Sequence, residues 1–176
     1  MSTSKRNFCI IGCGRLGISL AVFLSKQRFT PVAFCSKSTA SAKHAAAMAG
    51  QGIVYEDAVL AATSCDLIFI TTPDTQIEEV CEQIAKGGGF TGDSVVFHLS
   101  GALSSCILKT AQKAGAATGS IHPLQAFTPY EKGRKSPFSG INISLEGADR
   151  AVALGRTIVD ALDAKSFTIP TRAKTI

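Results

Sequence analysis

The chain has 176 residues, of which 45% are hydrophobic and 18% charged, with a formal net charge of +5. This composition favours one globular domain with a sizeable core and excludes a disordered chain. The densest basic stretch, residues 132–135, directly follows Glu131, so we expect a solvated loop there and no nucleic-acid partner.

The N-terminal residues superficially resemble a signal peptide, because Lys5 and Arg6 precede an apolar run. Arg15 and three glycines interrupt that run, so we expect neither a secretion signal nor a membrane span. The six cysteines form no CxxC pair, which argues against a metal site and fits a reducing compartment. We therefore expect a cytoplasmic protein that binds no metal.

Strand and helix patterns alternate along the chain. Short apolar runs between glycine, proline or polar residues predict strands at 8–11, 31–35, 53–55, 67–70, 94–99, 115–121, 141–145 and 167–169. Helical spacing and end signals predict helices at 16–24, 41–49, 56–63, 73–86, 104–113 and 150–162. The polar stretch 125–139 lacks both patterns and is a long loop, a candidate for function or disorder.

This alternation predicts parallel βαβ units, and therefore an α/β fold with a doubly wound, mainly parallel sheet (a Rossmann fold) and extra C-terminal strands. Ligands of such sheets bind outside the carboxyl ends of the strands. Every polar motif of interest falls at such an end, namely at 12–17, 36–39, 71–74, 100–101 and 122–123.

A GxGxxG motif joins the first predicted strand to the first predicted helix. In this context the first glycine permits a tight turn, the second admits a pyrophosphate, and the third lets helix and strand pack closely. The free N–H groups at the helix start then hold the anion. The motif predicts dinucleotide-binding residues Gly12, Cys13, Gly14, Arg15, Leu16 and Gly17. The alternative is another ligand of a similar turn, such as S-adenosylmethionine.

The end of the second predicted strand favours NADP over NAD. An NAD site usually carries an acid about 20 residues past the glycines, but no acid occurs between Gly12 and Glu56. Ser36, Lys37 and Ser38 stand there instead, and lysine and hydroxyl groups bind a 2′-phosphate. The alternative is that Lys37 is only a solvated loop residue.

Two further strand ends are candidate cofactor contacts. Thr71, Thr72 and Pro73 should lie against the ribose and nicotinamide, with Thr72 as N-cap and Pro73 as the first helical residue. Ser100 offers a hydroxyl to the substrate or to the nicotinamide carboxamide. The alternative for Ser100 is a helix-entry turn.

One histidine is a candidate acid–base catalyst. His122 lies at the predicted cofactor edge, and histidine exchanges a proton near neutral pH, as reduction of a carbonyl or imine requires. The alternative is a ring that satisfies a local backbone bond. His98 lies in an apolar strand and should be a core residue, whereas His44 should be exposed.

Four segments together carry a family resemblance: GCGRLG (12–17), DLIFITTPD (66–74), HLSGALSS (98–105) and GSIHPLQAF (119–127). They resemble an uncharacterised family of Rossmann-like oxidoreductases, the DUF2520 group, which is related to the 6-phosphogluconate dehydrogenase-like superfamily. The last segment is also similar to the one that carries the catalytic histidine of prephenate dehydrogenases. The resemblance therefore implies that His122 is the acid–base group and Ser100 a hydrogen-bonding partner.

The same resemblance implies a domain division. Members of this family continue into an all-helical domain that dimerises and closes the substrate cleft. We expect an NAD(P)-binding domain over 1–170 and the start of a helical domain at 171–176. By this resemblance Lys174 is a candidate counterpart of a catalytic lysine in related β-hydroxyacid dehydrogenases, and the alternative is a flexible terminal charge. The implied partners are a small-molecule substrate and a second copy, bound mainly through the helical domain.

Three functions stay open from the sequence. The first is an NADP-dependent dehydrogenase or reductase that acts on a small organic substrate. The second is a non-catalytic cofactor-binding sensor or regulatory module. The third is a methyltransferase, which the lack of an acid after the second predicted strand disfavours.

Overall fold

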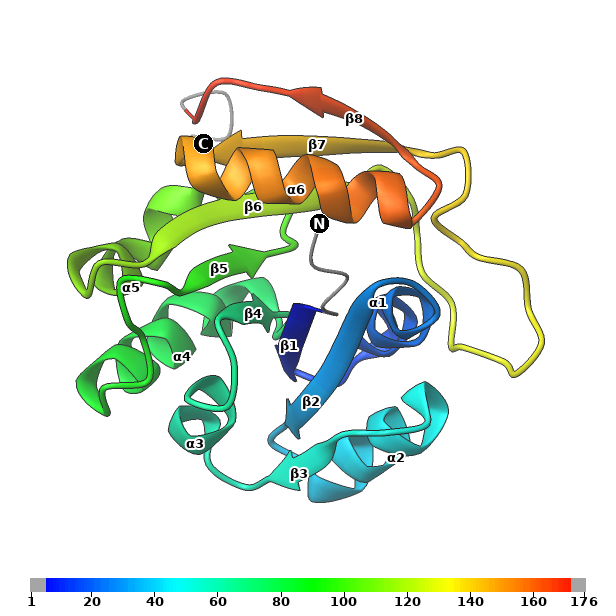
Figure 1. The fold of residues 1–176 in the computed structure, drawn as a ribbon, viewed down its shortest axis with the longest axis horizontal. Helices are drawn as coiled ribbons and strands as arrows, with labels where there is room; N and C mark the ends of the chain where they lie inside the picture. The colour runs from blue at the N-terminus through cyan, green and yellow to red at the C-terminus, as the bar shows by residue number, and fades with distance from the viewer. Residues whose placement is uncertain (1–5, 172–176) are drawn as a thin grey trace.

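Eight strands form one sheet in the order β3-β2-β1-β4-β5-β6-β7-β8 (Figure 1). The structure is a computed structural model and describes residues 6–171. Its strands are β1 (Arg6–Ile11), β2 (Phe29–Cys35), β3 (Ile53–Tyr55), β4 (Leu67–Ile70), β5 (Val95–His98), β6 (Ala117–Pro123), β7 (Asn142–Gly147) and β8 (Lys165–Thr168). Its helices are α1 (Arg15–Ser25), α2 (Thr39–Ala49), α3 (Ala58–Ala62), α4 (Asp74–Lys86), the 3-10 helix η1 (Ser105–Leu108), α5 (Lys109–Lys113) and α6 (Asp149–Ala161).

The sheet has the doubly wound topology that the sequence predicts. Strands β1 to β6 are parallel and follow the order 3-2-1-4-5-6. β7 runs antiparallel to β6, and β8 runs parallel to β7. The predicted fold class, including the extra C-terminal strands, is therefore confirmed.

Helices cover both faces of the sheet, which explains why its central strands are apolar throughout. α1, α2 and α6 pack on one face, where Phe8, Phe69 and Phe97 form a continuous aromatic row. α3, α4 and α5 pack on the other, so Cys9 and Ile68 are buried there. Figure 1 shows the two helix layers on either side of the strongly twisted sheet.

Two of the differences from the predicted element boundaries bear on the candidate site. α4 begins at Asp74, and Pro73 is its N-cap residue with φ −52° and ψ 148°, so the prediction of Thr72 as N-cap and Pro73 as first helical residue is wrong. Pro73 keeps an extended conformation that delays the helix by one residue. β6 extends to Pro123 because that residue pairs with Ile143 of β7. His122 therefore lies inside a strand.

The loop between β6 and β7 is irregular, as predicted, and packs on α1 through aromatic side chains. Phe138 is fully buried and contacts the rings of Phe23 and Phe127. Tyr130 contacts Phe23 edge to face at 5.9 Å between ring centroids. These contacts fix the loop against the body of the domain.

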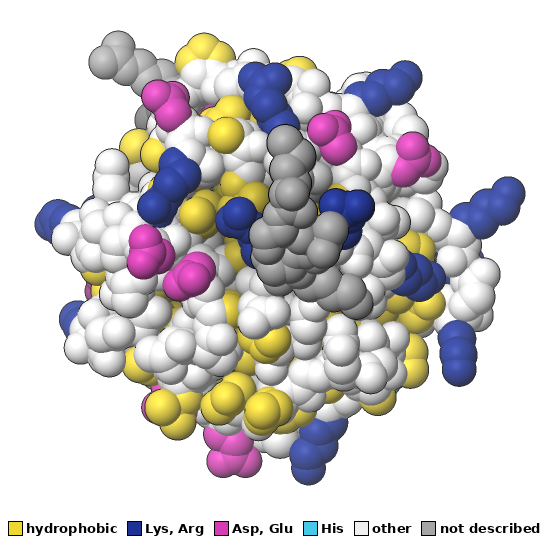
Figure 2. Space-filling model, viewed as in Figure 1, with side chains coloured by type: hydrophobic (Ala, Val, Ile, Leu, Met, Phe, Trp, Pro, Cys, Tyr) yellow, Lys and Arg dark blue, Asp and Glu magenta, His cyan; other side chains and the backbone are white. Residues whose placement is uncertain are grey.

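The surface carries mixed charge. On the face shown in Figure 2, Lys and Arg side chains are scattered among Asp and Glu side chains and do not gather in one patch. None of the helices within residues 6–171 is long and apolar enough to cross a membrane. The predicted counterpart of a catalytic lysine, Lys174, lies outside the described residues.

Candidate functional site

The glycine turn after β1 is tightly packed at two positions and open at the third. A Cβ on Gly12 (φ +103°) would stand 2.5 Å from the backbone nitrogen of Thr72, and one on Gly17 would stand 2.5 Å from the carbonyl oxygen of Gly12. A Cβ on Gly14 would meet nothing within 4 Å. The first and third glycines therefore hold the turn against the sheet, while the second leaves space beside the backbone.

Backbone hydrogen bonds fix this turn to the neighbouring strand ends. The Gly12 N–H donates to Cys35 O of β2 at 2.8 Å, and the Thr71 N–H donates to Ile11 O at 2.7 Å. The Thr71 hydroxyl donates to Gly12 O. α1 then starts with Gly14 as an N-cap that has no side chain and with no acid in its first turn, so its N-terminus keeps an unshielded positive dipole end.

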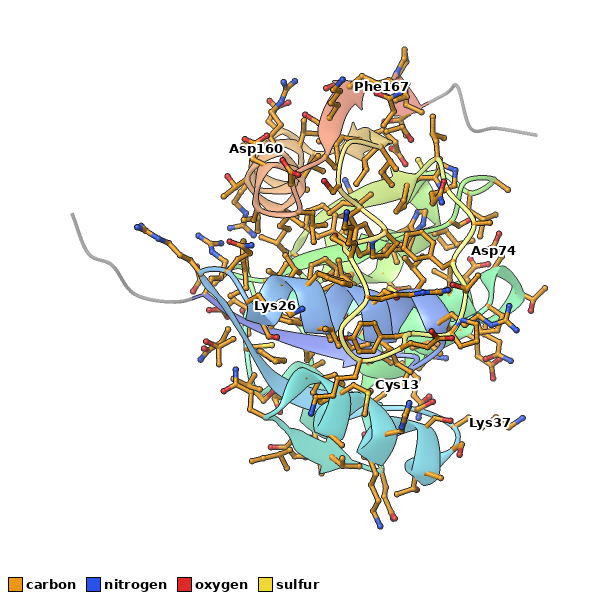
Figure 3. All side chains as sticks on the ribbon, turned by 90° about the vertical axis from the view of Figure 1, so that its right-hand side faces the viewer. Cys13, Lys26, Lys37, Asp74, Asp160 and Phe167 are labelled. Atoms are coloured by element: carbon orange, nitrogen blue, oxygen red, sulfur yellow. The ribbon has the colours of Figure 1, made fainter. Side chains whose placement is uncertain are left out.

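A cleft of about 550 Å³ lies beside the turn, between α4 and the ends of the first strands. Its walls include Gly12, Ser36 and Lys37. Lys37 is exposed, and Figure 3 shows it projecting at the same edge of the molecule as Asp74, on the side opposite Lys26. Ser38 caps α2 by accepting the Ser41 N–H, which gives it a structural role as well.

The cleft also holds residues that the sequence analysis missed. Glu56 and Glu79 are in its lining, together with Gln76, Val80 and Gln83 of α4. Since Cys35 pairs with Tyr55, the two strands end side by side, and Glu56 follows β3 next to Ser36. A sequence signal for this helix face exists, because the residues that follow the buried strand β4 include Gln76, Val80 and Gln83 at the helical spacing i, i+4 and i+7.

One buried polar atom of this region has no hydrogen-bond partner within the described part of the chain. Among residues 6–171, the Thr72 hydroxyl oxygen is buried without a hydrogen bond, and Thr72 lines the cleft. An unsatisfied buried hydroxyl is costly unless a ligand or water bonds it. Together with the space at Gly14 and the free helix N-terminus, it fits a bound dinucleotide phosphate.

Cys13 in the glycine turn is a packing residue. Burial, with a smaller contribution from Cys35, raises the pKa of the Cys13 thiol to about 12. Its Sγ donates to Cys35 O at 3.6 Å. The thiol therefore stays protonated and unreactive at neutral pH. Arg15 beside it is exposed, and Leu16 packs against the core.

Ser100 organises the turn after β5. Its hydroxyl donates to Asp74 Oδ2 at 2.7 Å and accepts the N–H groups of Ala102 and Leu103, each at 3.1 Å. These bonds use the one proton and two lone pairs of a hydroxyl. The structure thus gives Ser100 the turn-forming role that the sequence analysis kept as its alternative, and contact with a substrate or carboxamide stays a prediction.

His122 is half-buried at the end of β6 and is held by the same turn. Its Nδ1 lies 3.3 Å from Leu99 O, and its ring lies where a Cβ on Gly101 would stand. Because a carbonyl oxygen only accepts, the Nδ1 that faces it carries the proton. His98 is fully buried and His44 exposed, as predicted.

The predicted site residues end successive strands of one sheet edge, in the order β2, β1, β4, β5, β6. Four strand spacings of ~4.8 Å separate the Lys37 end from the His122 end by about 19 Å. The structure thus arranges Lys37, the glycine turn, Thr71–Pro73, Ser100 and His122 in a row along the carboxyl edge. Within residues 6–171, no group of three or more His, Cys, Asp or Glu is placed to hold a metal ion.

Solved structures share this fold. The chain is similar to protein BF3122 from Bacteroides fragilis, with a TM-score of 0.82, 18% identity, and coverage of 98% of this chain and 63% of that chain. It is similar to protein TM1727 from Thermotoga maritima, with a TM-score of 0.70, 26% identity, and coverage of 95% and 58%. It is also similar to prephenate dehydrogenase from A. aeolicus, solved with hydroxyphenyl propionate and NAD+, with a TM-score of 0.78, 14% identity, and coverage of 99% of this chain and 63% of that chain.

The chain spans about three fifths of the length of these structures. Dehydrogenases and reductases recur among the matches and have this fold, and some of them were solved with NAD+ or NADPH. No curated protein matches the chain. The family model of the Rossmann-like domain matches residues 1–123. Since that match covers more than half of the chain, the chain belongs to the Rossmann-like domain family.

Proposed function

We propose that this chain is the cofactor-binding domain of an NADP-dependent oxidoreductase that transfers a hydride to or from a small organic substrate. The observation that carries the proposal is the open glycine turn. Gly14 leaves space at the N-terminus of α1, beside a cleft of about 550 Å³ in which the buried Thr72 hydroxyl has no partner among residues 6–171. An anionic diphosphate would fill that space and neutralise the helix dipole.

Lys37 supports NADP as the cofactor. With Ser36 and Ser38 it places one cation and two hydroxyls at the end of β2, where a 2′-phosphate would lie. Glu56 opposes this choice, because its carboxylate lines the same cleft from the end of β3. We favour NADP because Lys37 lies in the turn that follows β2, where a 2′-phosphate is bound, whereas Glu56 follows the neighbouring strand β3.

The chemistry would take place near His122. A bound nicotinamide cofactor supplies or accepts the hydride. His122 would give a proton to the substrate oxygen or nitrogen, or take one from it, through Nε2. Leu99 O accepts the Nδ1 proton, so we assign the proton transfer to Nε2. Thr71, Thr72 and Pro73 would line the ribose and nicotinamide part, with Ser100 beside them.

We also propose that a helical domain completes the substrate cleft and forms a homodimer, as the resemblance to the DUF2520 group implies. Residues 1–170 would then bind the cofactor without forming the whole substrate site. Little turnover is expected from the chain of 176 residues alone. The second candidate, a non-catalytic sensor, uses the same pocket and differs only in the role of His122.

Calorimetric titration of the chain with NADPH and with NADH tests the binding proposal. We expect NADPH to bind at least about tenfold more tightly, the worth of one hydrogen bond to a charged group. Equal affinities would refute NADP specificity, and absence of binding to both would refute a cofactor domain. In a version that includes the helical domain, His122→Ala should abolish turnover and leave NADPH binding intact, whereas a sensor would have no turnover to lose.

A further inference from the structure

We infer that Asp74 is a positioning residue for His122 and acts through the Ser100 turn. This inference deepens the proposed function, since it concerns the group to which that function assigns the proton transfer. Asp74 is the first residue of α4, after β4, whereas His122 lies on β6, two strands away in the sheet. The turn between them, residues 99–103 after β5, links the two side chains.

Asp74 anchors the turn through Ser100. Asp74 Oδ2 accepts the Ser100 hydroxyl proton at 2.7 Å. The same hydroxyl accepts the N–H groups of Ala102 and Leu103, and thereby closes the turn on itself. One carboxylate oxygen therefore fixes the turn to the first turn of α4. That carboxylate lies at a helix N-terminus, where the helix dipole stabilises its charge.

The turn also contacts the imidazole of His122. Leu99 O receives the Nδ1 proton of His122 at 3.3 Å. Gly101 packs against the ring so closely that any side chain there would overlap Nε2 and Cε1. The turn thus contacts the ring at both nitrogens, through Leu99 O at Nδ1 and through the backbone of Gly101 at Nε2. A shift of the turn would loosen both contacts.

Ser100 is also held by groups other than Asp74. The Ser100 N–H donates to His98 Nδ1 at 3.1 Å, and Ser120 Oγ donates to Ser100 O at 3.4 Å. Both partners are buried on β5 and β6, so they fix the base of the turn. Asp74 is exposed and comes from a different strand end. Its bond therefore ties the turn to an element that neither of those two bonds reaches.

The readout is the tautomer of His122, which does not require a substrate. In the wild-type chain, 15N NMR of the imidazole should show the proton on Nδ1, since Leu99 O accepts it. Asp74→Ala should lower the ratio of the Nδ1–H to the Nε2–H form about fivefold, the loss that corresponds to one ordinary hydrogen bond. Asp74→Asn should retain the wild-type ratio, because its amide oxygen still accepts the Ser100 proton.

Asp149→Ala is the matched control. Asp149, like Asp74, is the exposed first residue of a 13-residue helix, but it lies on α6 after β7 and not on the helix that anchors the turn. It should lose a similar dipole interaction and leave the His122 tautomer unchanged. If Asp74→Ala does not fold, Asp74→Asn and Asp74→Glu replace it in the test. Asp74→Asn keeps the length of the side chain and should keep the wild-type tautomer ratio, whereas the longer side chain of Asp74→Glu should change it.

The outcomes separate this inference from the proposed function. An unchanged ratio in Asp74→Ala, an equal change in Asp149→Ala, or an Nε2–H ring in the wild type would overturn it. Where Asp74→Ala does not fold, a wild-type ratio in Asp74→Glu as well as in Asp74→Asn would overturn it, because the longer side chain should misplace the turn. Failure of NADPH to bind would refute the cofactor proposal and leave these NMR results unaffected.

Discussion

Gly101 and His122 are in direct contact: the imidazole occupies the place where any side chain of residue 101 would begin. The contact joins the turn after β5 to the end of β6. It explains why the HLSGALSS segment needs glycine at this position although the residue has no positive φ. The requirement comes from a neighbouring side chain and not from the backbone.

Gly101→Ala should therefore displace His122 with little loss of stability. The group that must move is a side chain, so we expect a change in the free energy of unfolding of about 1 kcal/mol or less. The NMR signals of the His122 ring should shift strongly, and NADPH binding should persist. Gly92→Ala is the control, because a Cβ there would meet nothing within 4 Å. An unshifted His122 signal in Gly101→Ala would contradict the contact.

The second and third glycines of the motif should separate binding from stability. A Cβ at Gly14 points into open space, so Gly14→Ala should cost the apo chain less than about 1 kcal/mol. It should weaken NADPH binding more than about tenfold, because the methyl group takes the space proposed for the diphosphate. Urea unfolding and calorimetry measure the two effects.

Gly17→Ala should show the opposite balance. Its Cβ would overlap Gly12 O and the Thr71 hydroxyl, and overpacking of this kind costs about 1–3 kcal/mol. α1 must then move away from the turn, and unfolding should occur at lower urea. If Gly14→Ala proves the more destabilising of the two, the assignment of an open cradle to Gly14 is wrong.

The sequence predicted the fold well and the site in part, for physical reasons. Buried parallel strands are continuous apolar runs, so periodicity and the GxGxxG motif were sufficient to order the sheet. The start of α4 was misplaced because proline favours the first helical position, whereas Pro73 keeps an extended ψ of 148° and the helix begins one residue later. The Asp74–Ser100 bond joins residues 26 positions apart, and no local pattern encodes such a pairing.

Glu56 shows a further limit of the sequence argument. It lies 44 residues past Gly12, whereas a ribose-binding acid usually lies about 20 residues past the glycines. It follows β3, which pairs with β2 at three positions. Only the assembled sheet places it in the same cleft as Lys37. The choice between NAD and NADP therefore depends on the opposite charges of Lys37 and Glu56, and the sequence around the end of β2 shows only the first of them.

Lys37→Ala and Glu56→Gln should move NADPH binding in opposite directions. Removing the cation should weaken NADPH about tenfold and change NADH less than about twofold, because only NADPH carries the 2′-phosphate. Glu56→Gln should tighten NADPH by about twofold to fivefold, since the repelling carboxylate is exposed and screened. Calorimetry of both cofactors with both variants checks this. Weaker NADH binding in Glu56→Gln would instead identify Glu56 as a ribose ligand and favour NAD.

The Cys13 thiol should make stability fall at alkaline pH. Its folded pKa of about 12 is higher than the ordinary value of 9.0, so the folded chain holds the proton more tightly than the unfolded chain. This contribution to stability is therefore complete below about pH 9 and is lost as the pH rises from about 9 toward 12. Burial is its main cause and the negative charge of Cys35 the smaller one.

Urea unfolding of Cys13→Ala at two pH values tests this sign. The stability difference from wild type should shrink by about 2 kcal/mol between about pH 8 and about pH 10.5, since about 1.5 pH units above 9 contribute ~1.36 kcal/mol each. Cys106→Ala is the matched control, because Cys106 is exposed and its removal should leave the pH dependence of wild type unchanged. A difference for Cys13→Ala that stays constant with pH would mean that the thiol titrates alike in the folded and unfolded chains.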